Sequence, residues 1–258
     1  VGELLKLAVS LRPRKIVVGL GGSGTNDGGA GLLAALGATA DVPLNCGGAP
    51  LAQLTAIDVG PARAALEDVE LVAATDVDNP LLGLTGASKT FGPQKGADDN
   101  TVLALDAALE IFAGAVGRHP NGKDPAVALG AGAAGGLGYA LMQLGATRAP
   151  GIATVLAATD FEARVRASDL VVTGEGCFDW QSMRGKVVTG VATTTMPTAR
   201  PCIVIAGDVL VGRREYSALG IAGAYSVAEF AGSAAKSMDD PVNWLQNASA
   251  RVARTWSR

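Results

Sequence analysis

Polar and charged residues follow short apolar runs at several places in the chain, and glycines surround them. The first such loop spans residues 19–29 and follows the apolar run 16–18. The residues in it that we predict to contact a substrate or a phosphate are Gly22, Ser23, Thr25, Asn26 and Asp27. Unpaired backbone N–H groups at the start of a helix attract anions, and glycine lets an anion come close. The stretch therefore predicts an anion site, with N-cap oxygens for the following helix supplied by residues 25–27.

Other interpretations of this loop stay open. Gly19, Gly21 and Gly24 satisfy the G-x-G-x-x-G spacing of dinucleotide-binding proteins. A dinucleotide fold also needs a second strand that ends in an acid about 20 residues further on. Asp41 stands at roughly that distance, but residues 38–40 do not form a convincing strand pattern. A tight turn without any ligand is the other alternative.

A second group of polar residues follows the apolar run 70–75. It begins with Asp76, Asp78 and Asn79, and a turn at residues 91–96 presents Lys95. Carboxylates at the C-terminal end of a strand in an α/β sheet lie where ligands bind. We therefore predict Asp78, Asn79 and Lys95 as substrate or phosphate contacts.

A third group follows the apolar run 169–173. It contains Glu175, Asp179 and Gln181, and then Gly185 and Lys186 at the predicted start of a helix. We predict Glu175 and Gln181 as further substrate or phosphate contacts. A solvated turn is the alternative interpretation of this group. Cys177 lies among these residues, but no histidine is near it in the sequence to lower the pKa of its thiol.

A further glycine-rich loop covers residues 130–138 and precedes a predicted helix over residues 139–144. It also matches G-x-G-x-x-G, yet no clear strand comes before it. Close helix packing and a second anion-binding loop are both compatible with this pattern.

Together, these groups are typical of phosphoryl transfer. Loops and lysines hold phosphates, carboxylates hold Mg²⁺, and one carboxylate takes the proton of the attacking hydroxyl. We predict Asp76 or Asp179 as the base or the Mg²⁺ ligand, and Lys186 as a stabiliser of negative charge. The G-x-x-x-x-G-K-[ST] motif and the protein-kinase motif set do not occur in this sequence.

The composition limits the class of protein. The chain of 258 residues carries a net charge of −3, which argues against nucleic acid as a partner. No apolar run approaches the roughly 20 residues of a membrane helix. Three cysteines without metal-ligand spacing predict a reducing, cytoplasmic setting. The single histidine, His119, reads as a loop residue and not as a catalytic one.

The order of apolar runs and helical patterns predicts the fold class. Strands and helices alternate in the second half, so we expect an α/β protein with a parallel sheet and helices on both faces. A terminal helix is predicted to begin at Asp240 and Pro241, and its expected apolar face consists of Val242, Leu245, Val252 and Trp256. Residues 38–68 are expected to be irregular.

Four segments resemble the bacterial type I glycerate kinases. They are GGSGTNDGGAGLLAALGA (21–38), TDVDNPLLGLTGASKTFGPQKGA (75–97), GAGAAGGLGYAL (130–141) and DLVVTGEGCFDWQSMRGKV (169–187). The resemblance implies phosphorylation of D-glycerate by ATP with Mg²⁺, usually to 2-phosphoglycerate. It also implies two α/β domains, a Rossmann-like parallel-sheet domain with a second one inserted in it and the active site in the cleft. Residues 1–150 would be mainly the inserted domain, and residues 151–258 mainly the Rossmann-like domain.

The chain departs from the family pattern at several positions. Gly24 replaces the usual alanine, and Cys177 stands where the family has an arginine, for which Arg184 is a candidate substitute. The family also has an N-terminal segment, which precedes the part of the family pattern that this chain enters at Val1. These departures favour one alternative to an active kinase, a truncated or impaired paralogue that keeps the fold. The other alternative is a nucleotide-binding oxidoreductase built on residues 19–24. The expected partners are D-glycerate and ATP, with a homodimer left open and no membrane or nucleic acid.

Overall fold

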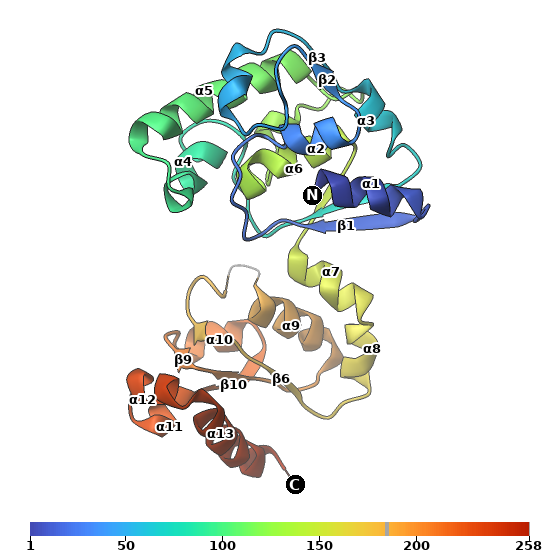
Figure 1. Ribbon diagram of the computed structural model, residues 1–258. Coiled ribbons are helices and arrows are strands. Elements are labelled where there is room, and N and C mark those ends of the chain that lie inside the picture. The colour runs from blue at the N-terminus through green and yellow to red at the C-terminus, as the bar shows by residue number, and fades with distance from the viewer. Residues whose placement is uncertain (184–185, 258) are drawn as a thin grey trace. The chain divides into compact units, whose positions relative to one another are not determined.

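The chain forms two compact units, seen in a computed structural model that describes residues 1–183 and 186–257. Unit 1 is Val1–Gly151 and unit 2 is Ile152–Arg258 (Figure 1). Both units combine parallel strands with helices, which confirms the α/β class expected from the sequence. Which of them corresponds to an inserted domain stays a prediction.

The sheet of unit 1 consists of parallel strands in the order β1-β4-β5. Their bounds are β1 (Lys15–Gly19), β4 (Glu70–Ala74) and β5 (Thr147–Ala149). Ile16 stands opposite Leu71 in the register, and both side chains are buried. The apolar runs predicted as strands therefore form neighbouring strands, and the first two polar groups both follow C-terminal strand ends in one sheet.

Helices pack around this sheet. They are α1 (Gly2–Ser10), α2 (Ala30–Ala35), α3 (Gly60–Ala64), α4 (Ala87–Phe91), α5 (Asp99–Val116) and α6 (Ala133–Gln143), with 3₁₀ turns at Ala49–Gln53, Pro93–Lys95 and Pro125–Val127. The core contains Leu33, Phe112 and Leu141, all fully buried. Asp98 caps α5 by accepting a hydrogen bond from the Thr101 N–H.

The expectation that residues 38–68 are irregular is wrong. They contain an antiparallel pair, β2 (Thr39–Ala40) with β3 (Ile57–Asp58), and then α3. Asp41, directly after β2, accepts hydrogen bonds from the backbone N–H groups of Thr55 and Ala56, directly before β3, and these bonds extend the pairing. Strands of two residues are too short to show the alternating pattern from which a strand is recognised.

Unit 2 has a parallel sheet in the order β10-β8-β6, and a short parallel pair. The strands are β6 (Val171–Thr173), β8 (Cys202–Ala206) and β10 (Ile221–Ser226), with β7 (Cys177–Phe178) beside β9 (Asp208–Val209). The helices are α7 (Gly151–Ala158), α8 (Phe161–Arg166), α9 (Val187–Thr195), α10 (Arg213–Ala218), α11 (Val227–Ala231), α12 (Ala234–Asp239) and α13 (Pro241–Trp256), and a 3₁₀ turn covers Met196–Thr198. This unit has its own apolar core, to which Phe178 and Val204 belong.

The terminal helix α13 begins as predicted, since Asp240 accepts a hydrogen bond from the Asn243 N–H. Its predicted apolar face is only partly correct. Val242 and Leu245 are 64% and 47% exposed, whereas Val252 is buried together with Ala248. The part of α13 that packs against the rest of unit 2 therefore lies in the later turns of the helix.

None of the helices that the structure describes combines the length and apolar character that crossing a membrane requires.

Candidate active site

The first glycine-rich loop lines a pocket of about 510 Å³ at the C-terminal end of β1. The structure brings Gly22, Ser23, Thr25 and Asp27 to this pocket, together with Asn45, which the sequence analysis missed. Among the described residues, the N–H groups of residues 21–25 donate no hydrogen bond. Successive free N–H groups that border a pocket are suited to bind an anion.

Asp27 shapes the end of this loop. Its two carboxylate oxygens accept hydrogen bonds from the N–H groups of Gly29 and Gly31. Helix α2 begins only at Ala30 and has six residues, so it starts later and is shorter than the sequence suggested. The free N–H groups of the loop therefore lie ahead of the helix start, so they, more than a helix dipole, would attract an anion.

The second glycine-rich loop packs against the first. The Gly28 N–H donates to the carbonyl oxygen of Gly135 over 3.0 Å, and a Cβ on Gly135 would overlap the carbonyl oxygen of Thr25. Ala134, Gly135 and Gly136 all have positive φ, which breaks the start of α6. Of the two interpretations left open for this loop, close packing is the one that the structure supports.

Lys95 places a cation beside the first loop. Its Nζ donates to the carbonyl oxygen of Thr25 over 2.6 Å. Burial lowers the pKa of Lys95, and the nearby charge of Asp27 opposes that shift. Asn26 donates to Ser88 Oγ over 2.8 Å, while its Oδ1 is buried without a partner among the described residues. The loop is thus bordered by a cation and by an amide with an unused acceptor.

The carboxylates after β4 have different surroundings. Asp76 is exposed, and its Oδ1 accepts a hydrogen bond from the Gly151 N–H over 3.0 Å. Asp78 forms an ion pair with Arg148, 2.6 Å from Oδ1 to Nη2. Asn79 donates to the carbonyl oxygen of Thr85. Asp78 and Asn79 therefore have structural partners, whereas Asp76 Oδ2 accepts no hydrogen bond from any described residue and is available for a proton or a ligand.

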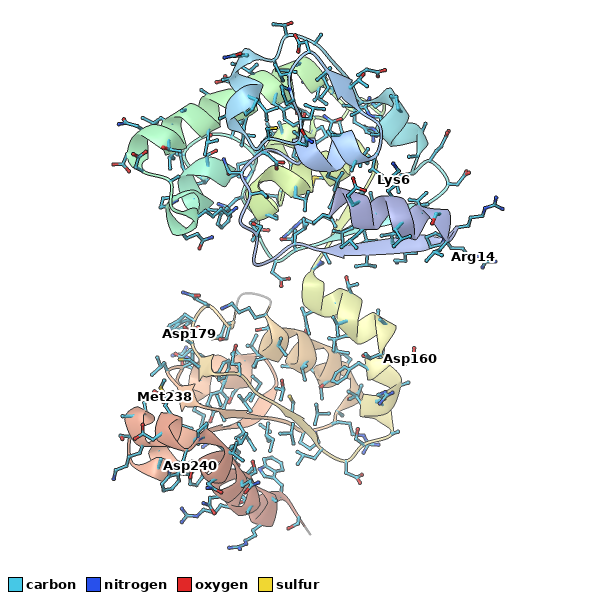
Figure 2. All side chains as sticks on the ribbon, in the orientation of Figure 1. Lys6, Arg14, Asp160, Asp179, Met238 and Asp240 are labelled. Carbon is cyan, nitrogen blue, oxygen red and sulfur yellow. The ribbon has the colours of Figure 1, made fainter. Side chains whose placement is uncertain are left out.

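The third group lies in unit 2, after β6, and Asp179 is labelled in Figure 2. Asp179 Oδ1 accepts hydrogen bonds from the N–H groups of Gln181 and Ser182. These bonds, led by that of Ser182, and the charge of Lys186 lower the pKa of Asp179. The Gln181 side chain is exposed, and Lys186 precedes α9 as its N-cap residue. Arg184 and Gly185, also singled out in the sequence, lie outside the described residues.

A carboxylate that the sequence analysis did not select lies close to this group. Asp208 follows β8, pairs in register with Cys177, and accepts a hydrogen bond from Ser226 Oγ. Burial and the charges of Asp179, Asp208 and Glu175 raise the pKa of the Cys177 thiol, which disfavours the reactive thiolate. The signal for Asp208 was present in the sequence, since it too follows an apolar run and a glycine.

The residues of this group fit a magnesium ion. Glu175 Oε1 is buried and has no partner among the described residues, and Asp179 stays ionised. No set of three or more potential ligands in the described part of the chain is arranged around a metal position. Mg²⁺ usually binds one or two carboxylates and takes its other ligands from water and phosphates, so a preformed cage is not required.

The fold and these groups define an α/β protein with a glycine loop of free N–H groups and with carboxylates at strand ends. The model of the Glycerate kinase family matches residues 1–257, and the chain belongs to that family. It is 43% identical to the glycerate 2-kinase of Escherichia coli K12 over 215 residues, which cover 81% of this chain and 56% of that protein. It is 39% identical over 257 residues to an uncharacterized protein of Mycobacterium tuberculosis, covering 98% of this chain and 61% of that one.

A solved structure is also similar. The putative glycerate kinase 2 of Salmonella typhimurium LT2 superposes with a TM-score of 0.73 at 39% sequence identity. The match covers 87% of this chain and 59% of that structure. The chain therefore spans about 60% of the length of the relatives that it matches.

Proposed function

We propose that the protein phosphorylates D-glycerate with ATP and Mg²⁺, and that the product is 2-phosphoglycerate. The observation that carries the proposal is the run of unpaired N–H groups at residues 21–25, bordering a pocket beside Lys95 in a member of the glycerate kinase family. The 2-phosphate is favoured because the Escherichia coli relative is named glycerate 2-kinase.

The roles follow from the surroundings of each group. The loop N–H groups and Lys95 bind an anion, either the carboxylate of glycerate or a phosphate. Asp179, whose pKa is lowered, is a weak base and is better suited to hold Mg²⁺. Glu175, whose Oε1 is buried without a partner among the described residues, is a second candidate ligand. Asp76 keeps a free carboxylate oxygen and is our candidate to accept the proton of the attacking hydroxyl. When bound, Mg²⁺ neutralises charge on the transferred phosphoryl group.

Binding is the first test, because it does not depend on turnover. Mg-ATP and D-glycerate are titrated separately into ¹⁵N-labelled protein, and amide shifts are followed by NMR. We expect at least one of the two ligands to shift the amides of residues 21–25. Absence of shifts with both ligands would overturn the proposal for the glycine loop.

Turnover is measured in a coupled ADP-release assay, with L-glycerate as the matched control substrate. We expect ADP release with the D-isomer, and ³¹P NMR of the product identifies the phosphorylated oxygen. Binding without turnover, in a chain that circular dichroism shows to be folded, would favour the impaired or truncated paralogue. Binding of NADH in place of ATP would favour the oxidoreductase, which the comparisons do not support.

A cytoplasmic location and a homodimer remain predictions. The described cysteines Cys46, Cys177 and Cys202 are free thiols, which is consistent with a reducing compartment.

A further inference from the structure

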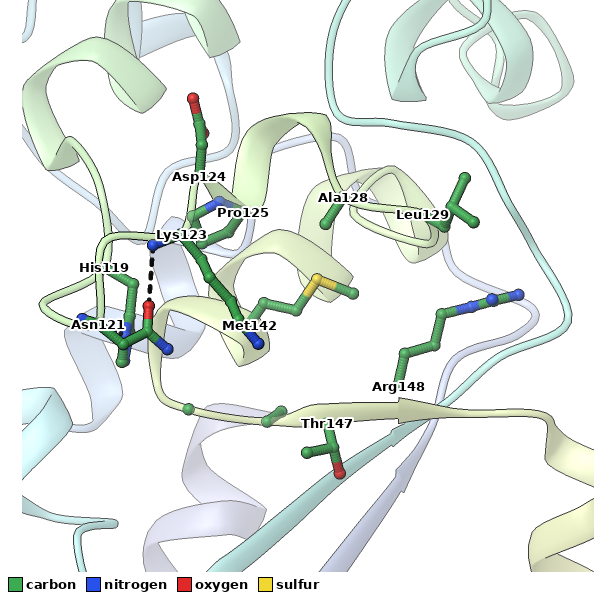
Figure 3. Close-up of a pocket in the computed structure, with 12 residues that line it drawn as sticks. His119, Asn121, Lys123, Asp124, Pro125, Ala128, Leu129, Met142, Thr147 and Arg148 are labelled. Carbon is green, nitrogen blue, oxygen red and sulfur yellow. Dashed lines mark hydrogen bonds between the residues drawn. The ribbon is translucent and has the colours of Figure 1, made fainter.

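Unit 1 contains a second pocket that shares no lining residue with the glycine-loop pocket. It has a volume of about 470 Å³ and lies between the loop after α5, the end of α6 and strand β5 (Figure 3). None of the residues predicted to act in phosphoryl transfer lines it. A pocket of this size is within the range of small-molecule sites.

One part of this pocket is apolar. Pro125, Ala128, Leu129 and Met142 line it, and Figure 3 shows the Met142 side chain extending between Lys123 and Leu129. Methionine adapts to irregular ligands because its side chain is unbranched and polarizable. The pocket therefore offers a surface for an apolar body.

Cationic and donor groups border the apolar part. Lys123 is exposed, and its ammonium group has no hydrogen bond or ion pair with any described residue. His119 Nδ1 accepts a hydrogen bond from the Asn121 N–H over 3.2 Å, so the neutral ring carries its proton on Nε2 and donates from there. These groups favour a negatively charged ligand.

One carboxylate also lines the pocket, but it is engaged elsewhere. Asp124 Oδ1 accepts a hydrogen bond from the Ala126 N–H over 3.0 Å, which caps a 3₁₀ turn. In Figure 3 the Asp124 carboxylate points away from Lys123 and Met142. Asp124 forms no ion pair with Lys123 in the described part of the chain, so the charge of Lys123 is not neutralised by it.

Arg148 connects this pocket to the loop after β4. Its Nη2 pairs with Asp78, and its Nε is buried with no partner among the described residues. The side chain packs on Gly130, where a Cβ would lie 3.0 Å from Arg148 Cδ. An anion near Arg148 would compete with Asp78 for the guanidinium group, and thereby change the surroundings of the Asp78 loop.

We propose that this pocket binds a small organic anion, a carboxylate or a phosphate monoester on an apolar body, and that Arg148 transmits its binding to Asp78. The inference concerns a site separate from the glycine loop. Its test measures binding alone, so its failure is distinguishable from failure of the proposed kinase activity.

The probes are naphthalene-2-carboxylate and 2-naphthyl phosphate, with the neutral naphthalene-2-carboxamide as the matched control. Each is titrated into ¹⁵N-labelled full chain, and Kd is obtained from amide shifts. We expect at least one anion to bind about tenfold more tightly than the carboxamide, as one charge-assisted hydrogen bond implies. The shifts should fall on Met142 and Thr147 and extend to Asp78. The anion with the lower Kd shows whether the pocket prefers a carboxylate or a phosphate monoester.

Two variants locate the site. Lys123→Gln should weaken the anion about tenfold and leave the carboxamide unchanged, whereas Lys236→Gln, an exposed lysine of unit 2, should change neither. Ala128→Phe fills the apolar part and should abolish binding of all three probes. Equal Kd values for anions and carboxamide, absence of binding, or shifts confined to residues 21–27 would each overturn the proposal.

Discussion

Lys95 is the residue whose protonation we expect to limit the reaction at high pH. Burial lowers its pKa below the usual 10.5, so the folded protein loses this cation at a lower pH than the unfolded chain. We therefore expect kcat/KM for D-glycerate to fall as pH rises through that lowered pKa. In the Lys95→Arg variant the guanidinium group stays charged, so the fall of kcat/KM at alkaline pH should shift to higher pH.

The measurement is a pH profile of kcat/KM for both proteins, read below pH 10.5. The effect of rising pH on stability has the opposite sign to its effect on kcat/KM. At a pH between the lowered pKa of the folded protein and the usual pKa of the unfolded chain, residue 95 binds more protons in the unfolded chain. The contribution of Lys95 to the free energy of unfolding therefore increases with pH across that range. Identical alkaline limbs in both proteins would remove Lys95 from the site.

Asp179 tests the carboxylate group of unit 2. In Asp179→Asn the amide oxygen can still accept the hydrogen bonds from Gln181 and Ser182, so the turn is retained while the charge is lost. We expect kcat to fall by at least about a hundredfold, in line with the loss of an essential charged group. Initial rates with Mg-ATP and D-glycerate measure the effect.

The control is Asp169→Asn, since Asp169 is fully exposed and its oxygen lies 3.8 Å from Arg200 Nη1. That variant should keep kcat within about a factor of two, because exposed ion pairs contribute little. An unchanged kcat in Asp179→Asn would exclude Asp179 as a metal ligand or base.

At the scale of elements, the broken start of α6 supports the glycine loop. Gly135 has a φ of +69°, and its Cα lies against the Thr25 carbonyl that Lys95 also contacts. We expect Gly135→Ala to lower the free energy of unfolding by about 2–4 kcal/mol, from overlap and strain together. Chemical denaturation followed by circular dichroism measures this change.

Gly114→Ala is the matched control, because Gly114 lies in α5 and an added Cβ there would meet nothing within 4 Å. It should stabilise the protein by about 0.5–1 kcal/mol through helix propensity. If Gly135→Ala were as stable as the natural protein, the packing of the two loops would not require glycine.

The elements that the sequence predicted well are those with local signals. The strands at residues 16–18 and 70–74 and the cap at Asp240 depend on neighbouring residues, and all are present. The short β2–β3 pair was missed because strands of two residues have no recognisable period.

Contacts in the candidate site were harder to predict, since they join distant parts of the chain. Lys95 and Thr25 are 70 residues apart, as are Arg148 and Asp78. No spacing rule connects such residues before the strand order is known. The glycine loop itself was identified because its residue types are unusual, and its roles in binding remain predictions.

At the scale of the whole molecule, the two units have separate apolar cores. Phe112 is fully buried in unit 1, where its ring lies 5.9 Å from that of Tyr139 and close to Gly28. We expect Phe112→Ala to destabilise unit 1 by about 3–5 kcal/mol and to accelerate hydrogen exchange at residues 15–19 and 70–74. Exchange in β8, within the core of unit 2, should keep its rate because that core lacks Phe112.

Leu103→Ala is the control, because Leu103 is 59% exposed on α5, the helix that also carries Phe112. It should lower the free energy of unfolding by less than about 0.5 kcal/mol. Equal acceleration in β8 would show instead that the two units unfold as one cooperative structure.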